Sequence, residues 1–173
     1  MKLENFKLID FYNQNQELQN EYIHILKYLK PRATKKKLFD MTLDEVTTIK
    51  TSSSDGEIVH CISLMNESTD EEVLDLPIVD FFAYFNFMQQ ELKNLNEIEK
   101  NNLTPTYTNP KWDVVGGNER MQKFGILNTL DMLAGGNILN YKEILKMKYS
   151  EIFAILLMRK EKNEIEYEIS KLK

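Results

Sequence analysis

One aromatic-rich stretch, Leu76–Glu99, constrains the fold of this chain more than any other part of the sequence. Behind Pro77, five aromatic residues fall within the seven positions 81–87. Large apolar residues recur there at steps of three and four, which places them on one face of a helix: Ile78, Phe81, Phe82, Phe85, Met88, Leu92 and Leu95. Tyr84 and Phe87 widen this face until the first two turns are apolar nearly all round. Such a helix is predicted to lie in the centre of a core or against a partner.

The other long segments are also predicted to be helices. Thr42-Leu43-Asp44-Glu45 is a capping box that opens a short helix, and Pro77 suits the first turn of the aromatic helix. The remaining predicted helices span 10–30, 118–134 with Met121, Phe124, Leu127, Leu130 and Leu133 inward, 140–145, and 151–171 with Ser150 as its cap. Residues 57–65 suit either a helix, which we favour, or a short buried strand. No stretch alternates with a period of two. We therefore predict an all-α fold, a compact multi-helix bundle.

A chain of 173 residues is close to the usual size of one domain. We expect a single helical domain over 1–173, with a subdivision into 1–100 and 118–173 as the alternative. The divider is 101–117, where prolines, glycines and asparagines exclude a long helix and predict an irregular loop. This loop carries Tyr107 and the single tryptophan, Trp112. It is either an arm that lies on a neighbouring protein or a segment whose Trp112 folds back to cap the core.

A weak internal repeat runs through the chain. Residues 69–83 align without gaps on residues 140–154, an offset of 71 positions. Each copy has a capped short helix, a tight corner with an apolar docking residue, and a longer helix that buries its first turns. A fainter third copy runs from Thr34 to Val46. Repeated packing of this kind predicts a helical core.

The composition argues against several classes of function. The net charge is −5, so no general attraction to nucleic acid is expected. The basic cluster Lys35–Lys37 either touches phosphate or an acidic partner, or is a solvated connector. Cys61 is the only cysteine, which excludes an internal disulfide and favours a reducing compartment. No signal peptide opens the sequence, and its longest apolar run is about a third of a membrane span, so we expect an intracellular protein without a membrane anchor.

No catalytic, cofactor-binding or metal-binding motif stands out. The two histidines, His24 and His60, have no metal-ligand spacing around them. His60 and Cys61 are neighbours on one helix and point about 100° apart, so they cannot act as base and nucleophile. The acids near residues 70–80 are explained by capping and by the helix dipole. We expect no catalytic, cofactor or metal site, and a protein that is not an enzyme.

The C-terminal segment carries a short heptad seam. Ile155, Lys162 and Ile169 are seven residues apart, and so are Met158, Ile165 and Leu172. A lysine at one such position can fix the register of a coiled coil. The alternative is a helix end that lies on its own core. The candidate partner-binding residues are therefore Tyr107, Trp112, Ile155, Met158, Ile165, Ile169 and Leu172.

Parts of the sequence resemble a known class of protein. The segments that carry the resemblance are Trp112-Asp113-Val114-Val115-Gly116-Gly117, Gly135-Gly136-Asn137-Ile138-Leu139-Asn140-Tyr141-Lys142-Glu143-Ile144-Leu145 and Ala154-Ile155-Leu156-Leu157. They resemble small helical proteins of tailed bacteriophages. Residues 39–46, Phe-Asp-Met-Thr-Leu-Asp-Glu-Val, are similar to the opening segment of tail-assembly chaperone-type proteins.

The resemblance implies a non-enzymatic part in virion assembly or in the particle itself. The implied partners are other proteins, namely tail or connector components or further copies of the chain, and the implied location is the virion or the host cytoplasm. The competing hypothesis is a small acidic inhibitor or regulatory binder of a host enzyme.

Overall fold

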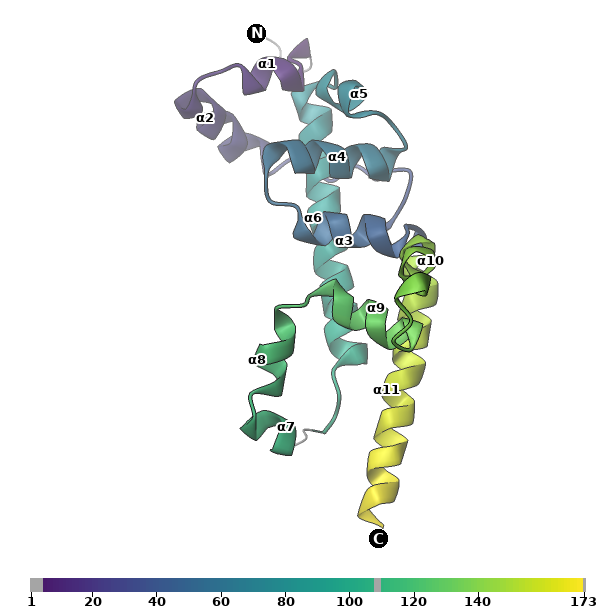
Figure 1. Ribbon diagram of the computed structural model, residues 1–173. Helices are drawn as coiled ribbons and strands as arrows, with labels where there is room; N and C mark the ends of the chain where they lie inside the picture. The colour runs from purple at the N-terminus through teal and green to yellow at the C-terminus, as the bar shows by residue number, and fades with distance from the viewer. Residues whose placement is uncertain (1–4, 108–109, 173) are drawn as a thin grey trace. The chain divides into compact units, whose positions relative to one another are not determined.

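The computed structural model describes residues 5–107 and 110–172 and is all-α, as predicted. No β-strand occurs among these residues (Figure 1). The α-helices are α1 Leu8–Tyr12, α2 Gln16–Leu26, α3 Leu43–Thr51, α4 Asp55–Asn66, α5 Asp70–Leu74, α6 Ile78–Leu103, α7 Pro110–Val114, α8 Gly117–Gln122, α9 Ile126–Ala134, α10 Tyr141–Lys146 and α11 Tyr149–Lys171. Short 3-10 helices lie at Leu38–Asp40 and Ile138–Asn140.

The chain divides into two compact units. The first comprises the described residues up to Met41 together with Thr48–Asn96, and the second comprises Thr42–Thr47 together with the chain from Glu97 onward. The expectation was a single domain, with a division at 101–117 as the alternative; the boundary after Asn96 instead lies inside α6, upstream of that segment. The second unit also takes a short piece from an early part of the sequence.

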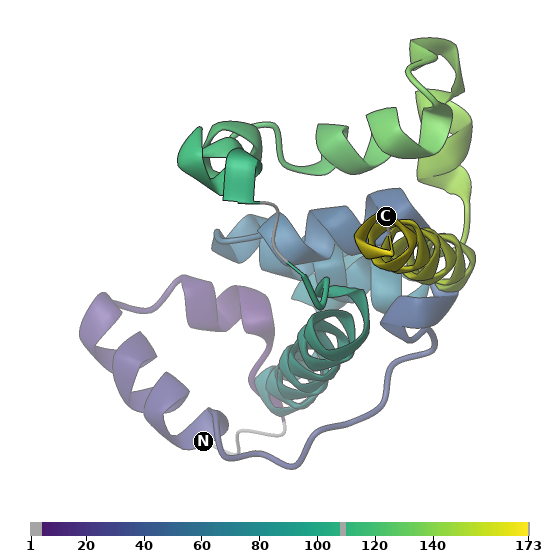
Figure 2. The ribbon, with the colours of Figure 1, turned by 90° about the horizontal axis from the view of Figure 1, so that it is seen from below.

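The first unit is built around the beginning of α6. Its buried side chains include Ile78, Phe81 and Phe82, which are 0, 3 and 7% exposed. Helices α1, α2 and α4 pack around this part of α6 (Figure 1 and Figure 2). Burying a large apolar side chain contributes about 1.5–3 kcal/mol to stability. The predicted central helix is therefore confirmed, although Pro77 precedes its first turn and supplies the carbonyl that accepts from the Phe81 amide.

The predicted helix over 10–30 is wrong, because the segment forms two helices. The side chain of Asn15 accepts a hydrogen bond of 2.9 Å from the Leu18 amide and so caps α2. Asparagine at an N-cap satisfies an amide that would otherwise lack an intrahelical partner. The polar residues 13–15 therefore end α1 and begin a new helix.

The predicted helix over 118–134 is also divided. Gly125 has a positive φ of +50°, which glycine adopts without strain, and it separates α8 from α9. Leu130 is buried as predicted, at 3% exposed. Met121, Phe124 and Leu127 were expected to face inward but are 40, 45 and 51% exposed.

The segment 101–117 is less irregular than predicted. Helix α6 continues to Leu103, and α7 begins at Pro110, the first helical position, which tolerates a residue without an amide proton. The last helix starts at Tyr149, so Ser150 lies within it and is not its cap.

The predicted repeat appears as a repeated local arrangement, one copy in each unit. In the first unit Lys7 and Pro77 form a single antiparallel bridge, and the Leu8 amide donates to the Leu76 carbonyl at 2.9 Å. In the second unit Thr42 and Lys148 form the same bridge, and the Leu43 amide donates to the Met147 carbonyl at 2.9 Å. Met147 and Lys148 are the residues 71 positions after Leu76 and Pro77.

Burial follows the same offset. Between the α4–α6 region and the α9–α11 region, the pairs 71 residues apart that are both buried are Val59 and Leu130, Val73 and Ile144, Ile78 and Tyr149, and Phe81 and Ile152. The third copy expected from Thr34 is not an additional one. Residues 41–43 pair with the corner between α10 and α11. Residues 6–8 pair with the corner between α5 and α6 in the same way, so residues 41–43 belong to the second copy.

Candidate functional site

Helix α11 of the second unit carries most of the predicted partner-binding residues, and it has two different faces. At 100° per residue, Leu156, Lys160 and Glu164 lie on one face, whereas Met158 and Ile165 lie on the opposite face. The first face is covered by the rest of the second unit. The second face is exposed.

The segment that follows α6 lies on the covered face of α11. The Tyr107 ring stacks on the Tyr167 ring, with centroids 4.0 Å apart and planes at 11°. One residue earlier, the Thr106 amide donates to Glu164 Oε1 at 2.9 Å. Lys160 Nζ lies 3.3 Å from the other carboxylate oxygen of Glu164. The Thr106 amide first, and then Lys160, lower the pKa of Glu164 against the effect of burial.

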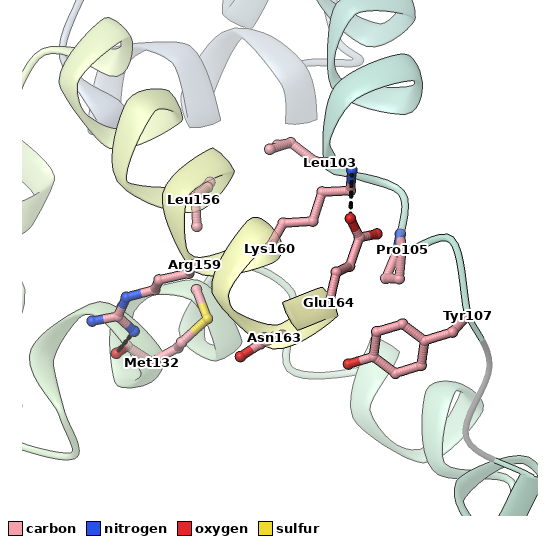
Figure 3. Close-up of a pocket in the computed structure, with 9 residues that line it drawn as sticks. All are labelled: Leu103, Pro105, Tyr107, Met132, Leu156, Arg159, Lys160, Asn163 and Glu164. Atoms are coloured by element: carbon pink, nitrogen blue, oxygen red, sulfur yellow. Dashed lines mark hydrogen bonds and ion pairs between the residues drawn. The ribbon is translucent and has the colours of Figure 1, made fainter. Parts of the chain in front are cut away.

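A cavity of about 220 Å³ lies between this segment and α11 (Figure 3). Leu103, Pro105 and Tyr107 line one side, and Leu156 and Asn163 line the other. The charged residues at its wall are already engaged: Lys160 pairs with Glu164, and Arg159 donates to the Met132 carbonyl. The cavity is smaller than the ~300 Å³ at which ordinary ligand pockets begin. Its wall can therefore accept one apolar group but offers no unengaged charge to an ion.

The exposed face of α11 presents the predicted heptad seam. Met158, Ile165, Ile169 and Leu172 are 64, 55, 52 and 86% exposed. Ile155, which begins the seam, is half-buried. An isolated exposed apolar side chain is ordinary, but four that align over four turns of one helix form a surface typical of protein contact. We call these four residues the α11 stripe.

Acidic residues flank the α11 stripe. With Ile155, Lys162 and Ile169 at the first core position of each heptad, three of the flanking positions hold Glu161, Glu166 and Glu168, and a fourth holds Arg159. Lys162 lies within the seam, and its Nζ is 3.8 Å from Glu166 Oε1. The stripe is therefore apolar in its centre and predominantly negative at its edges.

The two aromatic residues of the predicted loop lie in different places. Tyr107 lies on the covered face of α11, whereas Trp112 packs on α8. Trp112 Nε1 donates to Asn118 Oδ1 at 2.9 Å, and its ring lies so close to Gly117 that an added Cβ would come within 2.2 Å of Cε2. At 43% exposed, Trp112 does not cap a core. It belongs to a local contact between α7 and α8.

Sequence reasoning missed a second group of exposed apolar residues in the second unit. They are Val114, Val115, Met121, Phe124, Leu127, Ile138 and Leu139. The helical periodicity of Met121, Phe124 and Leu127 suggested an inward face, and only Gly125 signals that the predicted helix is broken. The group is spread over several short elements, in contrast to the single regular helix that bears the α11 stripe.

A cluster of Ser63, His60 and Asp70 in the first unit was also not predicted. The Ser63 hydroxyl lies 2.5 Å from Asp70 Oδ1, and His60 Nδ1 lies 3.2 Å from the same carboxylate. The contact with Ser63 first, and then His60, lower the pKa of Asp70. A nucleophilic serine needs the histidine as its own base. Here the serine reaches the carboxylate directly and is 3% exposed, so the arrangement ties α5 to α4.

Other chemistry is sparse in the part of the chain that the structure describes. Cys61 is fully buried, and burial raises the pKa of its thiol. Within residues 5–107 and 110–172, no three acidic, histidine or cysteine side chains are grouped so that they could hold a metal ion. None of the described helices is long and apolar enough to cross a membrane.

Comparison with protein-family models, with curated proteins and with solved structures gives no match to this chain. The functional interpretation therefore rests on the geometry of α11 and on the sequence.

Proposed function

We propose that this protein is a non-enzymatic binding protein that docks through the α11 stripe onto a helix of another protein. We further propose that it acts in the structure or assembly of a tailed-bacteriophage particle. The observation that carries the first proposal is the alignment of four exposed apolar side chains along one face of α11. The second rests on the resemblance of the sequence to small helical phage proteins.

The energetics of the stripe favour association. Burying each of its side chains would contribute about 1.5–3 kcal/mol. Association itself costs an estimated 4–15 kcal/mol in lost motion. Four side chains are therefore sufficient only if the partner buries all of them, which a second helix lying along α11 would do.

The charges around the stripe select the partner. A second copy of this chain would bring Glu161, Glu166 and Glu168 close to their own counterparts, and like charges across a seam oppose pairing. A helix with an apolar seam and basic flanks would instead pair with these carboxylates. An acidic residue opposite Lys162 would complete the match. The partner is therefore a different protein with a basic-flanked amphipathic helix.

The experiment that tests this proposal uses the products of the genes that neighbour the one for this protein. Each product is co-expressed with the full chain, and complexes are measured by size-exclusion chromatography with light scattering. We expect a stoichiometric complex with a tail or connector protein. Ile165→Lys should abolish it, because the substitution places a charge in the centre of the stripe.

Ile138→Lys is the matched control. Ile138 is 71% exposed and lies in the 3-10 helix 138–140, outside α11 and the α11 stripe. It should leave the complex intact. A complex that forms equally well with Ile165→Lys would contradict docking through the stripe.

The acidic flanks also favour a second function, inhibition of a host enzyme that has a basic surface. If a purified host enzyme binds this protein in a fixed ratio, loses its activity on binding and fails to bind the Ile165→Lys variant, enzyme inhibition replaces phage assembly as the proposed function. The α11 stripe would still be the docking surface.

A further inference from the structure

A cavity in the first unit has the chemistry of a site for an organic cation. It has a volume of about 250 Å³ and lies between α1, α2, α4 and α6. Four of the rings that line it belong to Phe11, Phe81, Phe82 and Phe85, and Tyr12 and Asp55 also line it. No lysine or arginine is among the residues that line the cavity. All of its lining residues lie in the first unit, and none belongs to the α11 stripe.

The aromatic wall is fixed by packing. Phe82 contacts three other rings, those of Phe11, Phe81 and Phe85, with centroid separations of 6.0, 5.5 and 6.1 Å and interplanar angles between 70 and 87°. Phe11, Phe81 and Phe82 are almost fully buried. Edge-to-face rings held in this way keep their positions, so a ligand would meet a preorganised surface.

The charge of the cavity is negative. Asp55 lies in the first turn of α4, and none of the described residues forms an ion pair with it. Burial, and then the negative charge of Asp55, raise the pKa of Tyr12 to about 12, so its phenol is neutral at physiological pH. The remaining polar residues of the wall, Gln16 and Gln19, are uncharged. The single formal charge at the cavity therefore belongs to Asp55.

Aromatic rings together with one carboxylate match a particular class of ligand. The ring faces attract cations, and the attraction is strongest for weakly hydrated ones such as alkylated ammonium groups. A metal ion is a poor fit, because calcium takes six to eight oxygen ligands and this wall offers few. The volume lies below the ~300 Å³ typical of ligand pockets, which suits a single headgroup.

We propose that this cavity binds an alkylated ammonium group, either that of a free small molecule or that of a methylated lysine side chain on another protein. The aromatic rings surround the methyl groups, and Asp55 neutralises the charge. The proposal is independent of the function assigned to α11.

The test compares a cation with its neutral isostere on the full chain. Choline and 3,3-dimethylbutan-1-ol have nearly the same shape and differ in charge. Binding is measured by isothermal titration calorimetry and by ligand-observed NMR. We expect choline to bind about tenfold or more tightly than the alcohol. A peptide containing trimethyllysine is measured in the same way. Whichever of the two cations binds more tightly shows whether the ammonium group comes from a free small molecule or from a methylated lysine.

Two variants test the roles of the carboxylate and the rings. Asp55→Asn should weaken choline binding about tenfold and leave the binding of the alcohol unchanged. Asp44→Asn is the matched control, because Asp44 is an exposed acid in the first turn of α3 and does not line the cavity. Phe85→Leu keeps an apolar wall but removes one ring face, and it should weaken both cations relative to the alcohol.

Circular dichroism establishes that each variant is folded. Asp55→Asn alone decides the outcome if Phe85→Leu does not fold, because Asp55 is exposed. Cations that bind no better than the alcohol, or that bind equally to the Asp55→Asn protein, would overturn the proposal. The first of these outcomes would make the cavity a site for a neutral apolar group.

Discussion

The ring of Tyr107 lies parallel to the ring of Tyr167 at a centroid distance of 4.0 Å, although 60 residues separate them in the sequence. Together with the hydrogen bond from Thr106 to Glu164, this stacking holds the described end of the segment after α6 on α11. Lys171 Nζ lies 4.3 Å from the centroid of the Tyr167 ring. Tyr167 therefore links the segment to the last turns of α11.

The stacked pair should be measurable as a coupling energy. Tyr107→Ala and Tyr167→Ala are each expected to lower the free energy of unfolding, and the double variant should lose less than the two single variants together. The difference should be about 0.5–1.5 kcal/mol, the contribution of one aromatic pair. Urea unfolding of the four proteins gives this value. Strict additivity would show that the two rings do not interact in solution.

Glu164 should make the segment sensitive to acid. Because its pKa lies below the ordinary 4.5, its stabilising contact is present above that value and is lost as the pH falls through the folded-state pKa. Glu164→Gln should reduce the protection of the Thr106 amide against hydrogen exchange at neutral pH. Glu161→Gln is the control, because the Glu161 carboxylate lies 3.5 Å from Lys160 but accepts no hydrogen bond from Thr106. Equal protection in the two variants would contradict the contact.

Gly117 should be required for the position of Trp112. A methyl group at residue 117 would clash with the indole ring, so Gly117→Ala should displace Trp112 and shift its fluorescence to longer wavelength. Gly56→Ala is the control, since nothing lies within 4 Å of its added Cβ. Trp112 is the only tryptophan, so the emission reports on this site alone. An unchanged spectrum in Gly117→Ala would show that the indole does not rest on α8.

The carboxylate of Asp70 should contribute to stability in a pH-dependent way. Its lowered pKa means that the contribution is present above about 3.8 and disappears as the pH falls through the folded-state pKa. Asp70→Asn should cost about 1 kcal/mol at pH 7, allowing for solvent screening of a half-exposed group. The two proteins should converge in acid. Glu71→Gln, at the next position of α5, should show no such convergence, and chemical unfolding across pH 3–7 measures both.

Local sequence signals predicted much of the fold. The capping box of Thr42 with Glu45 forms as expected, and Thr69 and Glu72 form another at the start of α5. The periodicity of the aromatic segment correctly identified the centre of the first unit. In contrast, the breaks at Asn15 and Gly125 depend on one residue each, and the apolar period continues across them. Periodicity alone therefore merged separate helices.

The candidate site was predictable only in part. Heptad spacing identified the α11 stripe because its residues lie on one helix and, for Leu172, at the C-cap of that helix. The stacking of Tyr107 on Tyr167 depends on how the chain returns after α6, which no local pattern encodes. The same holds for the aromatic cavity, where Phe11, Asp55 and Phe85 come from three separate helices. Sites assembled from distant segments become visible only in the folded chain.

The bridge between Thr42 and Lys148 limits how the chain can be truncated. The second unit is completed by residues 42–47, which are encoded between two parts of the first unit. A fragment that starts at residue 97 would leave the Met147 carbonyl without its donor from Leu43. The two units are therefore interleaved along the sequence, and a single truncation that removes the first unit also removes residues 42–47 of the second.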